Sequence, residues 1–521
     1  MGLLRAIVTV GGFTMLSRIL GFVRDILIAA TLGAGPIADA FFVAFKFPNL
    51  FRRLFAEGAF ASAFVPILAG HVEAKDERAA QVFAERALSG LFLIVSVVVV
   101  IAELTMPFLM MAFAPGFTED PAKFNLTVIL TQITFPYLLF VSMASLFSGV
   151  LNTHGRFAAA AATPILLNIC LIGAVILLAP LTPSVGHALA IGVFIAGLVQ
   201  VVFLYGACVR AGIILRPRKP ELADDIRLLF KRTIPVAIGA GVYQINLMID
   251  TIIASLLATG SIAYLFYADR VVQLPLGVVG VAVGTALLPS LSRAIKAGDA
   301  TAARNGQNRA IEFALLLTLP AAVALAMIAG PIVSTLFERG AFDAEASMKT
   351  AAALGVYAFG LPAYVMIKAL APGFFARGDT KTPVIIAVVA MAVNLGLNLM
   401  LMGPYQHVGI AMATVASSWL NVCLMASYLR KRGALDIDDR LKARFWRIAA
   451  ACALMAVVLW TAHDQLASAL TSLDMTVRVL AFVGLVAAGL FSYTAAAFLF
   501  RAVRANDLSA LRRRTVPLDA P

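Results

Sequence analysis

Apolar segments long enough to cross a lipid bilayer recur along the whole of this 521-residue chain. A membrane-spanning helix needs about 20 mostly apolar residues, and we count fourteen such segments. Charged residues make up only 13% of the chain, against about 25% in soluble domains. A soluble fold of this size has too little interior to hide so much apolar surface. The sequence therefore predicts an all-α polytopic membrane protein with fourteen transmembrane helices.

The predicted spans follow one another with short loops between them. The first could be mistaken for a secretory signal, but it is longer than the apolar core of a signal and is interrupted by Arg18, Arg24 and Asp25. We therefore expect it to be retained. In chain order the spans are roughly 7–33, 38–69, 87–113, 126–152, 158–181, 185–209, 226–257, 260–290, 310–336, 350–376, 382–403, 407–429, 445–465 and 476–503.

Basic residues are concentrated in alternate loops. The formal net charge is +13, and most Lys and Arg side chains fall in the even-numbered loops and the C-terminal tail. Cytoplasmic loops carry such an excess of positive charge, so we expect both termini in the cytoplasm and no nucleic-acid partner. The odd-numbered loops and their edges hold only Lys123, Arg339, Lys349 and Arg478.

An internal repeat relates the two halves of the chain. Residues 25–44 and 250–269 share eight of twenty positions at a constant offset of 225, and apolar composition does not explain the shared Asp and Gly. The halves look like two parallel, pseudo-symmetric six-helix lobes around a central cavity, about which such lobes can rock. We expect an N-lobe at 1–217, a C-lobe at 218–435, and two extra C-terminal helices with a basic tail at 436–521.

Several spans carry charged side chains at depths where lipid is expected. Each costs about 2.5–3.5 kcal/mol at the bilayer centre on insertion scales, so these side chains must face one another or a water-filled cavity. The basic members are Arg18, Arg24, Lys46, Arg52, Arg53 and Arg270, and the acidic members are Asp25, Asp39, Glu57 and Asp269.

The cations outnumber the anions in this set by two, which suits an anionic ligand. Arginine predominates, and its planar fork of donors suits phosphate. An alternative stays open, in which these charges are ion pairs that hold helices together, as Arg53 and Glu57 could at i, i+4. Lys46 and Arg53 could also lie at the cytoplasmic end of their span, where a basic residue is ordinary.

Motifs of built-in catalysis and metal binding are missing from the sequence. It contains no GxxxxGKS/T phosphate loop, no HExxH and no GxSxG. The four cysteines and five histidines show no ligand spacing. We therefore expect a transporter, not an enzyme, with no cofactor and no resident metal beyond a candidate coupling cation.

Two stretches, TMLSRILGFVRD from Thr14 and PNLFRRLFAEGAF from Pro48, carry a family resemblance that extends over essentially the whole chain. The chain resembles the MurJ (MviN) lipid II flippases, within the superfamily of multidrug and oligosaccharidyl-lipid exporters. The resemblance implies a multi-pass protein of the bacterial inner membrane with a role in peptidoglycan biosynthesis, cell-wall biogenesis and cell shape. Its substrate would be lipid II, the undecaprenyl-diphosphate-linked disaccharide-pentapeptide, moved to the periplasmic leaflet by alternating access.

The resemblance also implies roles for particular residues. The diphosphate and sugar would be held by Arg18, Arg24, Arg52 and Arg270, with Ser17, Asp25 and Asp39 alongside. Lys46, Arg53, Glu57 and Asp269 would be cavity or gating charges, and spans 13 and 14 would form a groove for the polyprenyl tail. A cation site that some members use matches Asp250, Asn394, Asn398 and Thr414.

Coupling and rival functions stay open at this point. Asn398 stands where a sodium-binding member has a carboxylate, so Na⁺ coupling, H⁺ coupling and a buried Asp bonded to two amides are alternatives. We expect a monomer whose partners are lipid II and membrane lipids. The rivals are a flippase for another lipid-linked oligosaccharide, a cation-coupled multidrug exporter, and a membrane-embedded glycosyltransferase or scaffold. The arginine surplus disfavours the exporter, because its substrates are cations.

Overall fold

The computed structural model describes residues 3–52, 60–219, 221, 223–472 and 474–503, apart from the side chains of 3–8, 235–240, 242–243 and 278–286. The described chain is helical, and its one β feature is an isolated bridge between Arg339 and Phe342. Nine helical segments of the described chain are long and apolar enough to cross a membrane. The predicted all-helical, polytopic membrane fold is confirmed, while the count of fourteen spans stays a prediction.

The chain divides into two compact units, which we describe separately. The first comprises Met1–Ala263 and Arg339–Ala346, and the second comprises Tyr264–Glu338 and Ser347–Pro521. The helices up to the first boundary are α1 (Leu3–Leu32), α2 (Pro36–Phe51), α3 (Ala61–Glu73), α4 (Glu77–Phe113), η2 (Pro115–Glu119), α5 (Pro121–Thr134), α6 (Tyr137–Thr153), α7 (Phe157–Gly173), η3 (Ala174–Leu178), η4 (Ala179–Leu181), α8 (Val185–Arg210) and α9 (Asp224–Ser255). They are followed by α10 (Ser261–Lys296), α11 (Ala300–Met327), α12 (Ala329–Phe337), α13 (Ala344–Phe375), α14 (Lys381–Lys431), α15 (Asp439–Gln465), α16 (Ala467–Leu470) and α17 (Met475–Leu499).

The sequence repeat appears in the backbone as two equivalent turns. Helix α2 begins at Pro36 and α10 begins at Ser261, which is the offset of 225 found in the sequence. Gly33 before α2 has φ +66° and Gly260 before α10 has φ +96°. Residues other than glycine rarely adopt these angles, so a glycine lies at each of the two reversals. The two glycines are not at matched positions of the repeat, because Gly33 falls opposite Ala258 at the offset of 225.

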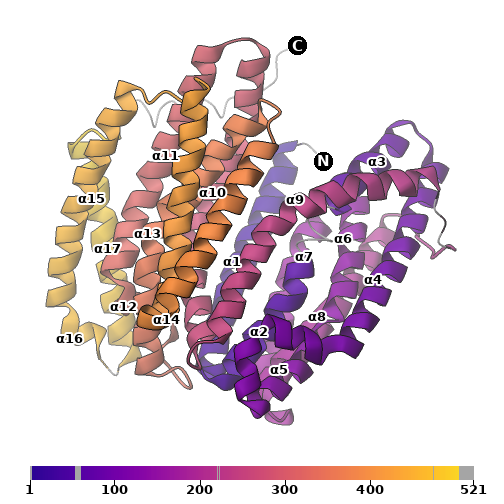
Figure 1. Ribbon diagram of the computed structural model, residues 1–521, viewed down its shortest axis with the longest axis horizontal. Coiled ribbons are helices and arrows are strands. Elements are labelled where there is room, and N and C mark those ends of the chain that lie inside the picture. The colour runs from indigo at the N-terminus through magenta and orange to yellow at the C-terminus, as the bar shows by residue number, and fades with distance from the viewer. Residues whose placement is uncertain (1–2, 53–59, 220, 222, 473, 504–521) are drawn as a thin grey trace. The chain divides into compact units, whose positions relative to one another are not determined.

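Helix α9 belongs to the first unit, although the predicted C-lobe begins before it. Its Ile226 and Leu229 are buried in a core cluster with Phe64 and Phe83 of α3 and α4. In Figure 1, α9 begins beside α3. The rings of Phe64 and Phe83 stack with centroids 5.4 Å apart. The compact units therefore do not follow the repeat boundary, and the division into lobes at residue 217 stays a prediction.

Helix α4 shows how the apolar surface is distributed. Its 37 residues extend about 56 Å at 1.5 Å per residue, so it is longer than the hydrocarbon layer of about 30 Å. One face is buried, with Met106 and Met110 fully covered, while Leu104 is 77% exposed and Phe108 is 73% exposed on the other. Such a continuous exposed apolar face is the surface that lipid covers in a membrane protein.

Helix α14 is two helices joined at a break. Gln406 has φ 49° and ψ −132°, at the boundary between the predicted spans 382–403 and 407–429.

The turn before α14 is closed by Asp379. Its carboxylate accepts hydrogen bonds from the Thr382 backbone N–H at 2.9 Å and from the Thr382 hydroxyl at 2.7 Å, and it pairs with Arg432. These donors, Thr382 first, hold the pKa of Asp379 well below its ordinary value.

Candidate functional site

The charged residues of α1 meet an asparagine of α7. Arg24 donates from Nη2 to Asp25 Oδ1 at 2.6 Å and from Nη1 to Asn168 Oδ1 at 2.8 Å. Asn168 in turn donates from Nδ2 to the Ser17 carbonyl at 2.9 Å. Arg24, Asp25 and Asn168 are all buried. This chain of bonds joins α1 to α7 and holds the Arg24 guanidinium in one orientation, so its donors already have protein partners in this structure.

Arg18 has different surroundings. It is half-buried, and it has no hydrogen-bond or ion-pair partner within the part of the chain that the structure describes. It lies one residue after Ser17, whose Oγ receives a second, longer bond from Asn168 at 3.4 Å. The guanidinium of Arg18 is therefore available to a ligand in a way that Arg24 is not.

Helix α2 carries the next group of predicted site residues. Arg52 donates from Nε to Asn49 Oδ1 at 2.9 Å, and Asn49 donates from Nδ2 to the Phe45 carbonyl at 2.7 Å. Lys46 Nζ lies 3.5 Å from Thr251 Oγ1 of α9. The predicted residues Arg53 and Glu57 lie outside the described residues, so their proposed pairing stays a prediction.

Asp39 forms the most elaborate polar contact of α2. Its carboxylate pairs with Lys123 Nζ of α5 at 2.9 Å. It also accepts the backbone N–H groups of Gly260 at 2.7 Å and Ala263 at 3.1 Å. Only 1% of Asp39 is exposed. A carboxylate at a helix N-terminus meets unpaired N–H groups and the positive end of the helix dipole, so Asp39 ties α2 to α5 and to the start of α10.

The short hairpin around Gly340, which also belongs to the first unit, packs against the turn between α1 and α2. This turn directly precedes the helix that carries Asp39. The Ala341 N–H donates to the Ala30 carbonyl of α1 at 2.8 Å. Gly340 has φ +59°, and a Cβ there would overlap the Ala30 carbonyl oxygen. A Cβ at Gly33, with φ +66°, would overlap the Ala341 carbonyl oxygen. Both glycines are therefore required for the two backbones to approach so closely.

Arg270 and Asp269 belong to the second unit, so their placement relative to α1 and α2 stays a prediction. The Arg270 guanidinium lies 4.6 Å from the centre of the Phe266 ring, within the range of a cation–π contact. Asp269 is exposed and accepts a hydrogen bond from Gln273 one turn further along α10.

The candidate cation site is divided between the units. Asn398 donates from Nδ2 to Asn394 Oδ1 at 2.9 Å, and Asn394 lies 3.4 Å from Ser417 Oγ. Ser417 in turn donates to the Thr414 carbonyl at 3.0 Å. These four residues form one polar cluster of the second unit, in which Thr414 is half-buried and the other three are buried. Asp250 lies on α9 in the first unit, so its placement beside this cluster stays a prediction. Among the described residues, no group of three or more His, Cys, Asp and Glu side chains could hold a metal ion.

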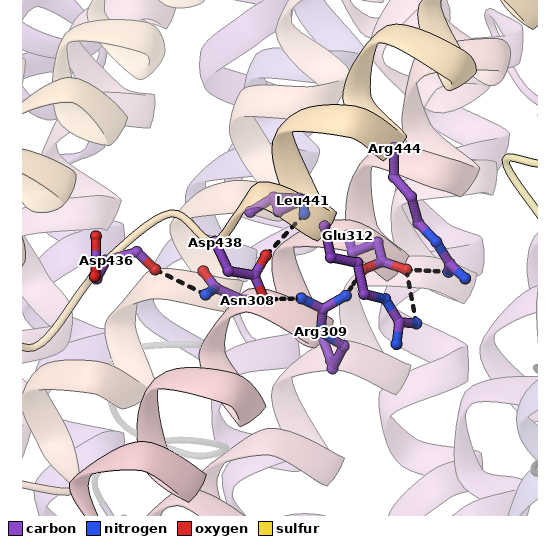
Figure 2. A network of polar contacts seen from close by, with 8 residues as sticks. Asn308, Arg309, Glu312, Asp436, Asp438, Leu441 and Arg444 are labelled. Atoms are coloured by element: carbon purple, nitrogen blue, oxygen red, sulfur yellow. Dashed lines mark hydrogen bonds and ion pairs between the residues drawn. The ribbon is translucent and has the colours of Figure 1, made fainter.

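Sequence reasoning missed a charged network that joins α11 to the start of α15 (Figure 2). Glu312 is 5% exposed and pairs with Arg309, Arg440 and Arg444. Arg309 also pairs with Asp438, which caps α15 by accepting the Leu441 N–H at 2.7 Å. The contributing segments lie more than 120 residues apart, so local spacing had no signal for it. One turn further along α11, the Leu316 carbonyl accepts a hydrogen bond from Tyr493 Oη of α17 at 2.6 Å.

A second missed contact holds the segment that leads to α9. Glu85 of α4 is 2% exposed. It pairs with Arg218 and accepts the Arg216 N–H at 3.1 Å, while Ser89 accepts the Arg218 N–H at 2.8 Å. The basic residues of this loop, which the sequence assigned to membrane orientation, therefore also bind the loop to α4.

Comparison with known proteins decides the family. The sequence profile described as "Lipid II flippase MurJ" matches residues 28–480. A protein of Rhizobium meliloti described as "Probable lipid II flippase MurJ" is 45% identical over 519 residues, covering 98% of this chain and 96% of its own length. The chain belongs to the MurJ family. The Burkholderia cenocepacia "Lipid II flippase MurJ" is 37% identical, with 83% of this chain and 85% of that protein covered.

Solved structures agree with the family assignment. A structure titled "Lipid II flippase MurJ, inward closed conformation" matches with a TM-score of 0.79 and 26% identity, covering 95% of this chain and 99% of the other. An inward-facing multidrug resistance MATE transporter of the MOP superfamily matches with a TM-score of 0.68 at 14% identity, covering 82% and 97%. The second match shows a shared fold. Membership of the MurJ family, over nearly the whole chain, is what identifies this protein as a transporter.

Proposed function

We propose that this chain is a flippase that moves lipid II from the cytoplasmic to the periplasmic leaflet of the bacterial inner membrane by alternating access. The observation that carries the proposal is membership of the MurJ family over nearly the whole chain. The alternation of basic loops supports a cytoplasmic location for both termini. We further propose that the protein acts as a monomer.

The two arginines of α1 have different roles in this proposal. Arg18 has no described protein partner and is half-buried, so it is the group that a diphosphate can bind without breaking an existing ion pair. Guanidinium and phosphate form paired, charge-assisted hydrogen bonds. Arg24 is hydrogen-bonded to Asp25 and Asn168. It therefore fixes α1 against α7 and contributes positive electrostatic potential to the site. Arg52 and Arg270 complete the proposed cationic set.

Asp39 supports the alternating-access part of the proposal. Its carboxylate holds the start of α10 and Lys123 of α5 at once. Any rearrangement that parts α2 from the start of α10 must leave this carboxylate or the N–H groups of α10 in need of new partners. We therefore call this contact a latch: it holds α2 to the start of α10 in one state and must be broken in another. It lies at the side of the membrane that we assign to the periplasm.

Depletion and rescue test the proposal. Cells lacking the natural flippase would express Arg18→Ala, Arg24→Ala or Arg270→Ala at matched levels. The control is Arg86→Ala, since Arg86 is half-buried and pairs with the exposed Glu221 outside the proposed substrate site. The fraction of lipid II reached by an enzyme added outside the cell would be measured. We expect the control to rescue growth and Arg18→Ala to leave lipid II in the inner leaflet. Full rescue by all three variants would overturn the assigned roles, and accumulation of a different lipid-linked sugar would favour another oligosaccharide substrate.

A further inference from the structure

A carboxyl group lies in the middle of the apolar part of α4 and is not accounted for by the proposed substrate site. Glu103 is ten residues before Phe113, the last residue of α4, which places it about 15 Å from that end. Its Oε1 atom is buried without a hydrogen-bond partner in the described part of the chain. The side chain is half-buried, between the covered Ala102 and the exposed Leu104.

The polar neighbours of Glu103 do not satisfy its carboxyl group. Gln132 Nε2 of α5 donates to the Glu103 backbone carbonyl at 3.3 Å, not to the side chain. Ser96 lies two turns earlier on the same side of α4, since residues at i and i+7 align on a helix. The Ser96 Oγ is also buried and has no partner among the described residues.

Charged groups on the helices that pack against α4 are directed elsewhere. Lys123 of α5 is paired with Asp39, and α6 contains no charged residue. His71 of α3 lies 3.5 Å from Asp225 of α9. The other charged residues on α4 and on the elements packed against it are Glu77, Arg78, Glu85 and Arg86 of α4, Glu73 of α3, Glu119 of η2, and Asp224, Arg227, Lys231, Arg232 and Asp250 of α9.

Those remaining groups do not compensate a charge on Glu103. The charges of α4 itself lie at least 17 positions away, about 25 Å along the helix. Glu85 and Arg86 are engaged by Arg218 and Glu221, and the basic residues of α9 belong to its first three turns. A carboxylate at this depth is expensive unless it is paired, so the structure favours the neutral, protonated acid.

We propose that Glu103 is a membrane-embedded proton-binding site of this transporter. Its ligand is H⁺, which is bound when the carboxyl is enclosed as described here and is released when water or a cation reaches it in another state of the transport cycle. Its consequence for transport rests on the proposed flippase function, whereas proton binding itself does not. The site is separate from the Asn394–Asn398 cluster and gives the chain a route for coupling to a proton gradient.

A hydrophobic carbodiimide tests proton binding directly, because it reacts with protonated carboxyls in apolar surroundings. The purified full chain in detergent or lipid would be treated and the modified residues located by mass spectrometry. Glu312 is the matched internal control, because it is also buried but is held by three arginines. We expect modification at Glu103, not at Glu312, with a rate that falls about tenfold per pH unit once the acid is deprotonated.

Variants separate this inference from the proposed function. Glu103→Asp should keep the labelling, and Glu103→Gln, close in shape to the neutral acid, should lose it while the protein still folds. In proteoliposomes the wild type should flip lipid II faster under an imposed pH gradient, and Glu103→Gln should flip at a rate independent of the gradient. No labelling at Glu103, or an equal gradient response in both proteins, overturns the inference. Labelling without any flipping by the wild type overturns the proposed function instead.

Discussion

The network around Glu312 provides a quantitative prediction about how α15 is held to α11. Glu312→Gln keeps the side-chain volume but removes the one carboxylate that Arg309, Arg440 and Arg444 share. The Arg444 side chain is only 9% exposed, so the substitution leaves a guanidinium buried beside a neutral amide. Breaking a buried pair in this way costs about 3–5 kcal/mol.

The members of the network should differ in their contributions according to burial. Arg440 lies 3.4 Å from Glu312, and its side chain is 50% exposed, so Arg440→Ala should cost about 0–1 kcal/mol as exposed pairs do. Arg309 keeps its second partner, Asp438. Most of the loss should therefore come from the pair between Glu312 and Arg444.

Unfolding of the purified protein in detergent measures these costs. Glu221→Gln is a matched control, because Glu221 pairs with Arg86 at 2.5 Å but is 59% exposed. Glu312→Gln should lower the free energy of unfolding by several kcal/mol and Glu221→Gln by about 1 kcal/mol or less. Adding Arg444→Met to Glu312→Gln should recover part of the loss, since the buried charge is then gone. Equal effects of the two Glu→Gln changes would refute the reasoning.

Three further predictions follow from contacts within single units. Asp39→Asn removes a buried charge beside Lys123 and should cost about 3–5 kcal/mol, seen as a lower free energy of unfolding and greater labelling of a cysteine introduced near the start of α10; unchanged labelling would contradict the latch. Gly340→Ala should destabilise by more than about 1 kcal/mol because it combines positive φ with overlap, whereas Gly35→Ala, with nothing within 4 Å, should be much milder; similar melting curves would argue against the close approach. The pKa of Asp379 is lowered in the folded protein. The stability that this adds is complete above the ordinary pKa of about 3.9 and is lost as the pH falls toward the folded-state pKa. Between pH 5 and pH 3 the wild type should therefore lose more stability than Asp379→Asn, and parallel pH profiles would contradict this.

Much of the membrane architecture could be predicted because its physical cause is local. Apolar runs of about 20 residues form helices in lipid, where backbone groups must bond within their own segment. The repeat also could be predicted, because it is carried by residue identities at a constant offset, among them Asp25 with Asp250 and Gly35 with Gly260. The break at Gln406 falls between the predicted spans 382–403 and 407–429, where the short stretch GPYQH separates two apolar runs.

The candidate site was only partly predictable. Sequence identified Arg24 and Asp25 as charges that must avoid lipid, but it did not identify Asn168 as the residue that receives Arg24. Lys123 looked like a loop residue and is in fact buried against Asp39. Partners far apart in the chain leave no periodic signal, so their pairing depends on how the helices pack.

The sequence by itself determined that this chain resides in a membrane, that its halves repeat, and that its spans hold more cations than anions. These properties follow from the composition and order of short segments, because the transfer of each segment into lipid depends on that segment alone. Only the tertiary structure decided which charges are used for holding helices together and which stay available. Arg24 and Glu312 have partners from distant segments, whereas Arg18 has none among the described residues. Glu103 likewise has no described counter-charge, because packing brought none to it.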